Sequence, residues 1–200
     1  MTISLAIDTS TSRTSAAIIE DGALLWYGFR DGATSHGDAL PSLVKQALEL
    51  QSEIDQVVVG MGPGPFTGLR VGIAFARSFA LARGIVAIGI CSLDAIAAQV
   101  AEVDDFIIAT DARRKEVYWA RYQGGKRAAG PGVEFPLELA KRDLPIFGEG
   151  AVKYGIGDND EISYPDLLSL VSLGQSEENH LSEPLYLRRP DALPTSERAK

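Results

Sequence analysis

Short apolar runs bounded by polar residues occupy the first third of the chain, and they predict three strands. The runs lie at residues 3–10, 14–20 and 23–30. Asp21-Gly22 separates the second run from the third and is typical of a tight hairpin turn. Trp26 and Tyr27 are neighbours in the third run, so their side chains should point to opposite faces of the sheet. We therefore expect the chain to open with an antiparallel meander.

Helical spacing replaces this pattern in the next stretch. After Gly37 the apolar residues recur every three or four positions, which predicts an amphipathic helix of about three turns. They are Ala39, Leu40, Leu43, Val44, Ala47 and Leu48. A second helix is predicted over 69–83, and Gly84 should end it. The remaining elements are buried strands at 55–60 and 85–90 and a helix at 92–100 with Ser92 as its N-cap. This half therefore has the predicted order βββαβαβα.

The second half of the chain repeats the opening pattern. Residues 106–125 predict a strand, a charged turn and another strand, and the first of these ends at Asp111 just as the first strand of the chain ends at Asp8. This echo predicts two related α/β lobes, over 1–102 and 103–200. The rest of the second lobe carries a short strand within 144–150, a helix over Pro165–Ser172 and an acidic loop at 175–180.

The composition is that of a globular protein, because 46% of the 200 residues are hydrophobic and 23% are charged. There are 19 Lys and Arg against 27 Asp and Glu, and the formal net charge of −8 argues against independent binding of nucleic acid. Cys91 is the single cysteine, which excludes an intramolecular disulfide and a cysteine-based zinc cluster and favours a cytoplasmic location. No apolar run reaches the roughly 20 residues of a membrane span, and no signal peptide is expected.

The densest motif is the segment Gly62–Gly68, GPGPFTG, between a predicted strand and a predicted helix. Its backbone N–H groups and the helix N-terminus could hold an anion or a phosphate. Against this, two prolines remove two N–H donors, and no Gly-Lys-Ser/Thr follows as in a P-loop. We favour the second interpretation, a rigid turn that fixes the helix relative to the sheet.

A stripe of small residues runs down the second predicted helix at four-residue spacing. It consists of Gly68, Gly72, Ala76 and Ala80. Another backbone can approach such a stripe closely, so the stripe predicts either tight internal packing, which we favour, or contact with a helix of another chain. The apolar face of the first predicted helix would provide a companion surface in the second case.

Polar residues offer few candidates for chemistry. His36 and His180 lack a second histidine at metal-binding spacing, so capping or exposed positions are expected for both. Serine hydrolase chemistry is not expected, because the chain has no GxSxG elbow. The run Asp8–Ser12 at a strand end could bind a metal-phosphate or form a hydrogen-bonded turn. The basic residues 113–115 could receive an anion or an acidic partner, or form a solvated turn, which we favour.

Taken together, these motifs make the chain similar to the bacterial TsaB (YeaZ) family. The resemblance spans the chain and rests on five segments: AIDTSTSRTSAAI, His36 with Leu40-Pro41, GPGPFTGLRVGIAFARSFAL, TDARRKEVYWARY and PLYLRRPDA. It implies an α/β fold of the actin/Hsp70/hexokinase-like type, with two related lobes and mixed sheets. Relatives with this fold bind nucleotide between the lobes through residues that correspond here to Asp8, Thr9, Ser10 and Asp111. The glycines that accompany such residues are missing here, so no cofactor is expected.

The resemblance also implies a function. TsaB is the non-catalytic partner of TsaD, which acts with the ATPase TsaE to form N6-threonylcarbamoyladenosine at position 37 of tRNAs that read codons starting with A. TsaD makes the tRNA contacts, and TsaB alone forms a homodimer through its TsaD-binding surface. TsaD holds a metal with two histidines where this chain has only His36, so neither a metal nor a catalytic residue is expected.

For the paired surface, the resemblance implies residues of the first two helices. They are His36, Leu40, Leu43, Val44, Ala47, Gly68, Gly72 and Ala76. Gly72→Arg or Val44→Glu should then abolish pairing and leave the monomer folded. The alternatives are a metal-dependent glycoprotease and a kinase-like ATPase acting alone. The missing second histidine argues against the first, and the missing glycine-bearing phosphate motifs argue against the second.

Overall fold

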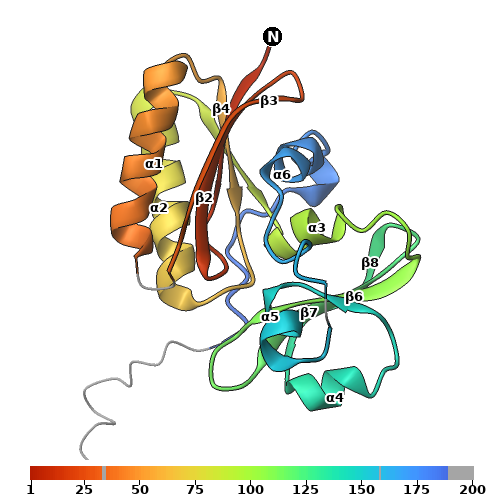
Figure 1. Cartoon of the computed structure of the whole chain (residues 1–200). Coiled ribbons are helices and arrows are strands. Elements are labelled where there is room, and N and C mark those ends of the chain that lie inside the picture. Colours follow the sequence, from red (N-terminus) through yellow and green to blue (C-terminus); the bar gives the residue numbers. More distant parts are fainter. Residues whose placement is uncertain (33–34, 158, 189–200) are drawn as a thin grey trace, which may run out of the picture.

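Two β-sheets form the frame of the molecule in a computed structural model that describes residues 1–32, 35–157 and 159–188 (Figure 1). The first sheet has the order β3-β2-β1-β4-β5. Its strands are β1 (Ile3–Asp8), β2 (Arg13–Glu20), β3 (Ala23–Asp31), β4 (Gln56–Gly60) and β5 (Val86–Ile90). β1, β2 and β3 form the predicted antiparallel meander, whereas β4 and β5 continue the sheet in parallel to β1.

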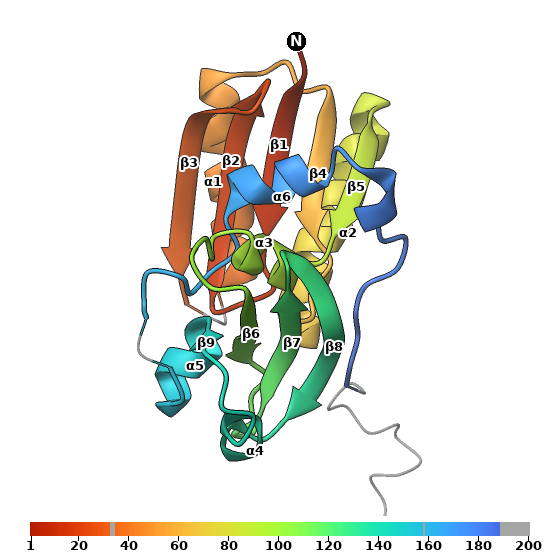
Figure 2. The ribbon, with the colours of Figure 1, turned by 90° about the vertical axis from the view of Figure 1, so that its right-hand side faces the viewer.

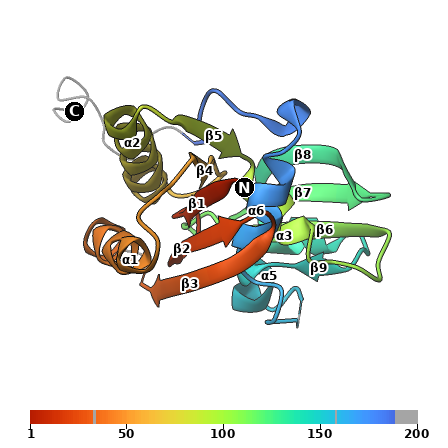
Figure 3. The same cartoon turned by 90° about the horizontal axis from the view of Figure 1, so that it is seen from above.

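Helices cover both faces of this sheet, as Figure 3 shows from above. α1 (His36–Leu50) and α2 (Phe66–Arg83) lie side by side on one face, and α3 (Ser92–Ala97) and α6 (Leu167–Leu173) lie on the other. Alternate residues of the strands therefore enter two cores, with Leu5 and Ile7 facing α1 and α2, and Ala6 facing α6. None of the described helices is long and apolar enough to cross a membrane.

The second sheet repeats the first in a reduced form (Figure 2). Its order is β8-β7-β6-β9, which matches β3-β2-β1-β4, and β9 is parallel to β6 as β4 is to β1. Its elements are β6 (Asp105–Asp111), β7 (Val117–Gln123), β8 (Lys126–Glu134), α4 (Pro136–Ala140), β9 (Ile146–Phe147) and α5 (Glu149–Tyr154). The two related α/β lobes expected from Asp8 and Asp111 are therefore present as two mixed sheets.

Most predictions for the first half are confirmed. The element order is βββαβαβα, and the hairpin turn at Asp21 and Gly22 has positive φ values of 46° and 81° at its two central residues. Trp26 packs into the core beneath α1, while Tyr27 pairs with Ala17 and lies on the opposite face. Gly84 ends α2 in the left-handed conformation, as predicted.

Several boundaries and elements differ from the predictions. α2 begins at Phe66 rather than residue 69, and the prediction of Ser92 as an N-cap is wrong, since Cys91 holds that position and no side chain caps the helix. β8, α4 and α5 were not predicted. β8 has the sequence KRAAGPGVE, whose two glycines and proline hide its pairing with β7.

After the second sheet, the chain returns to pack on the first sheet. α6 packs on β1, β2 and β4 although it follows the second sheet in sequence, so the division at residue 102 stays a prediction. Residues 181–188 then run from one sheet to the other. The N–H groups of Leu181 and Leu185 donate to the carbonyls of Gly89 and Met61, and the Arg188 guanidinium donates to the carbonyl of Ala112 (2.8 Å).

Candidate functional site

Asp8 lies at the carboxyl end of β1 and is completely buried. One carboxylate oxygen accepts hydrogen bonds from the backbone N–H (2.8 Å) and hydroxyl (2.7 Å) of Ser10, and the other accepts from the hydroxyl of Ser92 (2.7 Å). Burial raises the pKa of Asp8, and these hydrogen bonds oppose that shift. Because both oxygens are already engaged inside the protein, the carboxylate is a structural anchor between β1 and α3.

The Gly62–Gly68 segment, which includes the start of α2, packs directly against the residues that follow β1. A Cβ at Gly64 would collide with the backbone of Ser10, and a Cβ at Gly68 would stand 2.7 Å from the carbonyl of Thr9. The N–H of Ser92 donates to the Gly62 carbonyl at 2.8 Å. These contacts support the rigid-turn interpretation, because the glycines are where another backbone approaches most closely.

The small-residue stripe of α2 is buried within the chain. All four of its members are buried, and a Cβ at Gly72 would collide with the Thr9 hydroxyl, which donates to the Gly68 carbonyl at 2.8 Å. Internal packing, the favoured alternative, is therefore confirmed. It follows that Gly72→Arg would disturb the fold of the monomer itself, so the expectation that this variant stays folded is wrong.

His36 is the first residue of α1 and is buried, which corrects the expectation of an exposed or capping position. Its Nδ1 lies 2.7 Å from the Thr14 hydroxyl of β2, and its ring contacts the position where a Cβ of Gly68 would stand. Burial lowers the pKa of His36, and the positive charge of Arg113 lowers it further. His36 therefore joins α1, β2 and α2 as a neutral imidazole. His180, in contrast, is exposed and lies 2.8 Å from the Gly174 carbonyl at the end of α6.

Asp111 occupies the matching position at the end of β6. Its carboxylate accepts hydrogen bonds from Lys153 (2.6 Å) and Tyr154 (2.9 Å) of α5, and Arg113 lies within 3.3 Å. Burial would raise the pKa of Asp111, but the hydrogen bonds from Lys153 and Tyr154 outweigh it and the pKa is lowered. Burial and the bond to Asp111 raise the pKa of Tyr154 to about 12.

The basic residues after Asp111 adopt an unusual backbone. Arg113, Arg114 and Lys115 all have φ between 52° and 62°, a left-handed conformation that L-residues rarely hold in succession. The N–H of Arg113 donates to the Asp111 carboxylate at 3.1 Å, so the aspartate holds the start of this turn. The solvated turn expected from the sequence is thus a left-handed turn anchored at Asp111.

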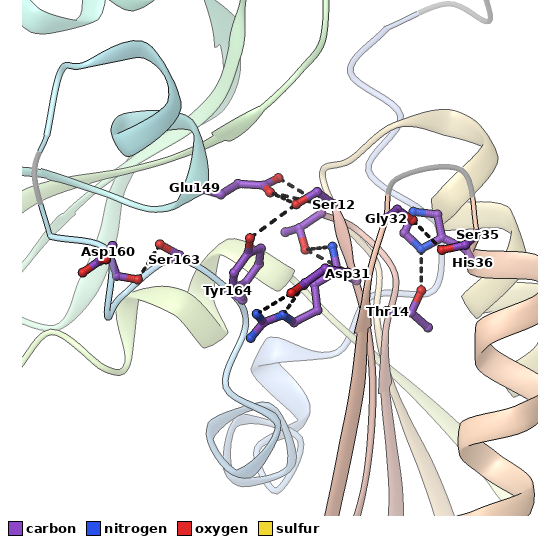
Figure 4. Close-up of polar contacts among 12 residues, drawn as sticks. Ser12, Thr14, Asp31, Gly32, Ser35, His36, Glu149, Asp160, Ser163 and Tyr164 are labelled. Atoms are coloured by element: carbon purple, nitrogen blue, oxygen red, sulfur yellow. Dashed lines mark hydrogen bonds and ion pairs between the residues drawn. The ribbon is translucent and has the colours of Figure 1, made fainter.

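Side chains from distant segments meet between the two sheets (Figure 4). The backbone N–H of Ser12 lies 3.2 Å from both carboxylate oxygens of Glu149, and the Ser12 hydroxyl donates to the same carboxylate. Burial raises the pKa of Glu149. Next to this contact, the Arg13 guanidinium lies 3.9 Å from the ring centre of Phe29 and 4.0 Å from that of Tyr164. This cluster connects β2 and β3 to the segments around α5 and α6.

The apolar residues expected at the partner surface face inward. Leu40, Leu43, Val44 and Ala47 pack on the sheet and are at most 4% exposed, so they are core residues of the chain itself. Val44→Glu would therefore place a charge in this core and would not leave the monomer intact. The exposed faces of α1 and α2 consist of other residues, among them Pro41, Lys45, Ala74 and Leu81.

Sequence reasoning found the two aspartates and Ser12 but missed the distant residues that they contact. Ser92, Lys153 and Glu149 lie 84, 42 and 137 positions from the residues they contact. No spacing rule connects such positions, and only the repeated strand ends offered a signal. Among the described residues no group of three or more His, Cys, Asp or Glu side chains could hold a metal ion.

Comparisons with known proteins agree with this geometry. Residues 30–144 match the family model described as TsaD, tRNA N6-adenosine threonylcarbamoyltransferase. A Mycobacterium tuberculosis protein of uncharacterized function is 41% identical over 95% of this chain and 93% of its own length. TsaB of Haemophilus influenzae, a tRNA threonylcarbamoyladenosine biosynthesis protein, is 33% identical over 92% of both chains. The structure of YeaZ from Pseudomonas aeruginosa superposes with a TM-score of 0.75, at 25% identity over 94% of this chain and all of that one.

The repeated strand order and the two aspartates at equivalent strand ends define a two-lobed α/β protein with two related mixed sheets. In this molecule both aspartates are bound by the protein's own side chains. The chain belongs to the TsaB (YeaZ) family.

Proposed function

We propose that this protein is the non-catalytic partner of a TsaD-type transferase, acting with TsaE to form N6-threonylcarbamoyladenosine at position 37 of tRNAs that read codons starting with A. TsaD would hold the tRNA, and this chain would support it from a cytoplasmic location. The single thiol of Cys91 fits such a reducing compartment.

The observation that carries this proposal is that both strand-end aspartates are hydrogen-bonded to other residues of the same chain. Asp8 is fully buried with its oxygens bonded to Ser10 and Ser92, and Asp111 is bonded to Lys153 and Tyr154. A metal-phosphate would need these oxygens free. A fold that keeps the two-lobed frame but closes this position is better suited to binding a partner than to catalysis.

The outer face of the α1–α2 pair is the proposed docking surface for TsaD. α2 exposes Ala74, a small residue that allows a second helix to approach closely, and Leu81 is 84% exposed. The buried residues of α1 and α2, among them His36 and Gly72, set the position of the two helices and do not touch the partner themselves. The same surface is the proposed contact between two copies when TsaD is absent.

The first experiment measures threonylcarbamoyladenosine formation on tRNA by purified TsaD and TsaE with their substrates, with and without this protein. We expect modification to require the protein. Equal modification in its absence would contradict the accessory role, and ATP hydrolysis by the protein alone would point to the kinase-like alternative.

The docking surface is tested by copurification with TsaD. Ala74→Arg on α2 should abolish copurification, because the long cation fills the space a partner helix would take, while Ala128→Arg on the exposed part of β8 should not. Both alanines are exposed, so the two variants should unfold at similar denaturant concentrations. Retained copurification of Ala74→Arg would place the contact elsewhere.

A further inference from the structure

A pocket of about 750 Å³ opens between the end of α3, the second sheet and η1 (Glu177–Asn179), a single turn of 3₁₀ helix. Its walls come from four separate parts of the chain, which are the end of α3 with the loop that follows, the start of β6, the β7–β8 hairpin, and the end of α6 with η1. All of its lining residues lie outside α1 and α2. The pocket is therefore separate from the proposed docking surface.

The base of this pocket is held in shape by the protein itself. Phe106 and Tyr122 are each 3% exposed and stack with their ring centres 5.5 Å apart. The Tyr122 hydroxyl donates to one carboxylate oxygen of Asp94 at 2.6 Å, and the Arg127 guanidinium lies 3.4 Å from the other. Asp94 and Arg127 thus neutralise each other, and the pocket is formed before any ligand enters it.

Aliphatic side chains make up much of the wall above this base. They are Ala97, Ala98, Val100, Ala101, Val103 and Leu173. These side chains carry no hydrogen-bonding groups, so they suit the methylene groups of a ligand rather than its polar parts.

The remaining charges of the pocket are mainly negative. Glu102 and Asp104 lie on the wall that leads into β6, and Glu178 lies on η1. None of the three has an ion-pair partner among residues 1–32, 35–157 and 159–188. Within the same residues, Lys126 is the one lining cation that lacks such a partner, because Arg127 is paired with Asp94. Three free carboxylates against one ammonium group favour a positively charged ligand.

We propose that this pocket binds an aliphatic polyamine, a chain of methylene groups that carries several ammonium groups. The methylene groups pack on the aliphatic wall, and the ammonium groups approach Glu102, Asp104 and Glu178 from inside the pocket. The carboxylates alone would attract any cation, whereas the wall selects one with an apolar chain. This site does not rest on the proposed function, and it leaves the proposed contacts of α1 and α2 unchanged.

The test is isothermal titration calorimetry of the full chain with spermidine at low ionic strength. Wild type should bind spermidine saturably, with one molecule per chain. The double variant Glu102→Gln with Glu178→Gln should weaken binding by roughly tenfold or more, because two attractions between ammonium and carboxylate are lost. Glu53→Gln with Glu161→Gln is the matched control, since it removes two exposed carboxylates outside the pocket and should bind as wild type does.

Two further variants separate binding in the pocket from attraction to an acidic surface. Ala98→Trp fills the pocket from an exposed position without changing the charge, so it should abolish binding. Lys126→Gln removes the repelling ammonium group and should tighten spermidine binding, whereas it would weaken the binding of an anion. Circular dichroism of each variant reports whether the fold is retained.

Four outcomes would overturn the proposal. They are the absence of saturable binding to wild type, equal weakening in the pocket variant and its matched control, full binding by a folded Ala98→Trp variant, and binding of the dicarboxylate adipate in place of spermidine. Because Lys126→Gln predicts a gain in affinity, its result stands even if one of the other substitutions unfolds the chain.

Discussion

Three glycines of the Gly62–Gly68 segment and α2 are required because the turn after β1 lies against them. Gly64, Gly68 and Gly72 form a surface on which the turn after β1 rests, and each would collide with Thr9 or Ser10 if it carried a Cβ. Gly37, on the exposed side of α1, has no neighbouring atom within 4 Å of its Cβ position. The two kinds of glycine have opposite consequences for substitution.

Gly72→Ala should lower the free energy of unfolding by about 1–3 kcal/mol, because the added methyl group overpacks the contact with Thr9. Gly37→Ala is the matched control in a helix and should be neutral or stabilising by up to about 1 kcal/mol. Urea unfolding of both variants measures the difference. Equal stability of the two would show that Thr9 can move aside at little cost.

His36 gives stability a dependence on pH. Its pKa is lowered in the folded state, mainly by burial, so the folded protein holds fewer protons than the unfolded chain just below pH 6.5. The contribution of a neutral His36 is therefore complete above pH 6.5 and is lost as pH falls toward the folded-state pKa. His36→Gln should lose less stability than wild type between pH 7.5 and pH 5.5, measured by urea unfolding at both values. Parallel losses in the two proteins would contradict this.

At the scale of elements, local signals account for the first half better than for the second. Alternating faces in β2 and β3, the Asp21-Gly22 turn and the Gly84 end of α2 are encoded within a few neighbouring residues. α4 and α5 have five and six residues, too few for a periodic pattern to emerge. α5 is positioned by its contacts with β6, and α4 packs through Leu139 into the apolar core beside the second sheet.

α6 is a short helix whose start depends on one side chain. The Asp166 carboxylate accepts a hydrogen bond from the backbone N–H of Ser169 at 2.7 Å. Asp166→Ala should lower the free energy of unfolding by about 1 kcal/mol, whereas Asp166→Asn, which keeps an acceptor, should have a smaller effect. Thermal unfolding of the two variants separates the loss of the cap from the loss of charge. Equal destabilisation by both would assign the effect to the charge.

At the scale of the whole molecule, the contact between Ser12 and Glu149 connects the two sheets. A double-mutant cycle with Ser12→Ala and Glu149→Ala should give a coupling energy of about 0.5–3 kcal/mol, since the side chains share a hydrogen bond across a partly buried interface. Additive effects of the two substitutions would mean that the sheets are held together by residues 181–188 and by the packing of α3 instead.

The expected partner surface shows where inference from the sequence ends. The helical spacing of Leu40, Leu43 and Val44 correctly identified one apolar face of α1, but the same spacing is produced by a core face and by a docking face. The burial of these side chains against β2 settles which of the two they form. The exposed side of the helices, where we propose that the partner binds, is the opposite one.

By itself the sequence determined the opening meander, the order βββαβαβα, the duplication marked by Asp8 and Asp111, and the close approach at the small residues of α2. All of these depend on neighbours within a few positions or on a repeated local motif. The tertiary structure alone decided that Ser92 is hydrogen-bonded to Asp8, that Lys153 is hydrogen-bonded to Asp111 and that Glu149 is hydrogen-bonded to Ser12. These contacts join segments far apart in the chain, and only the packing of the two sheets brings them within hydrogen-bonding distance.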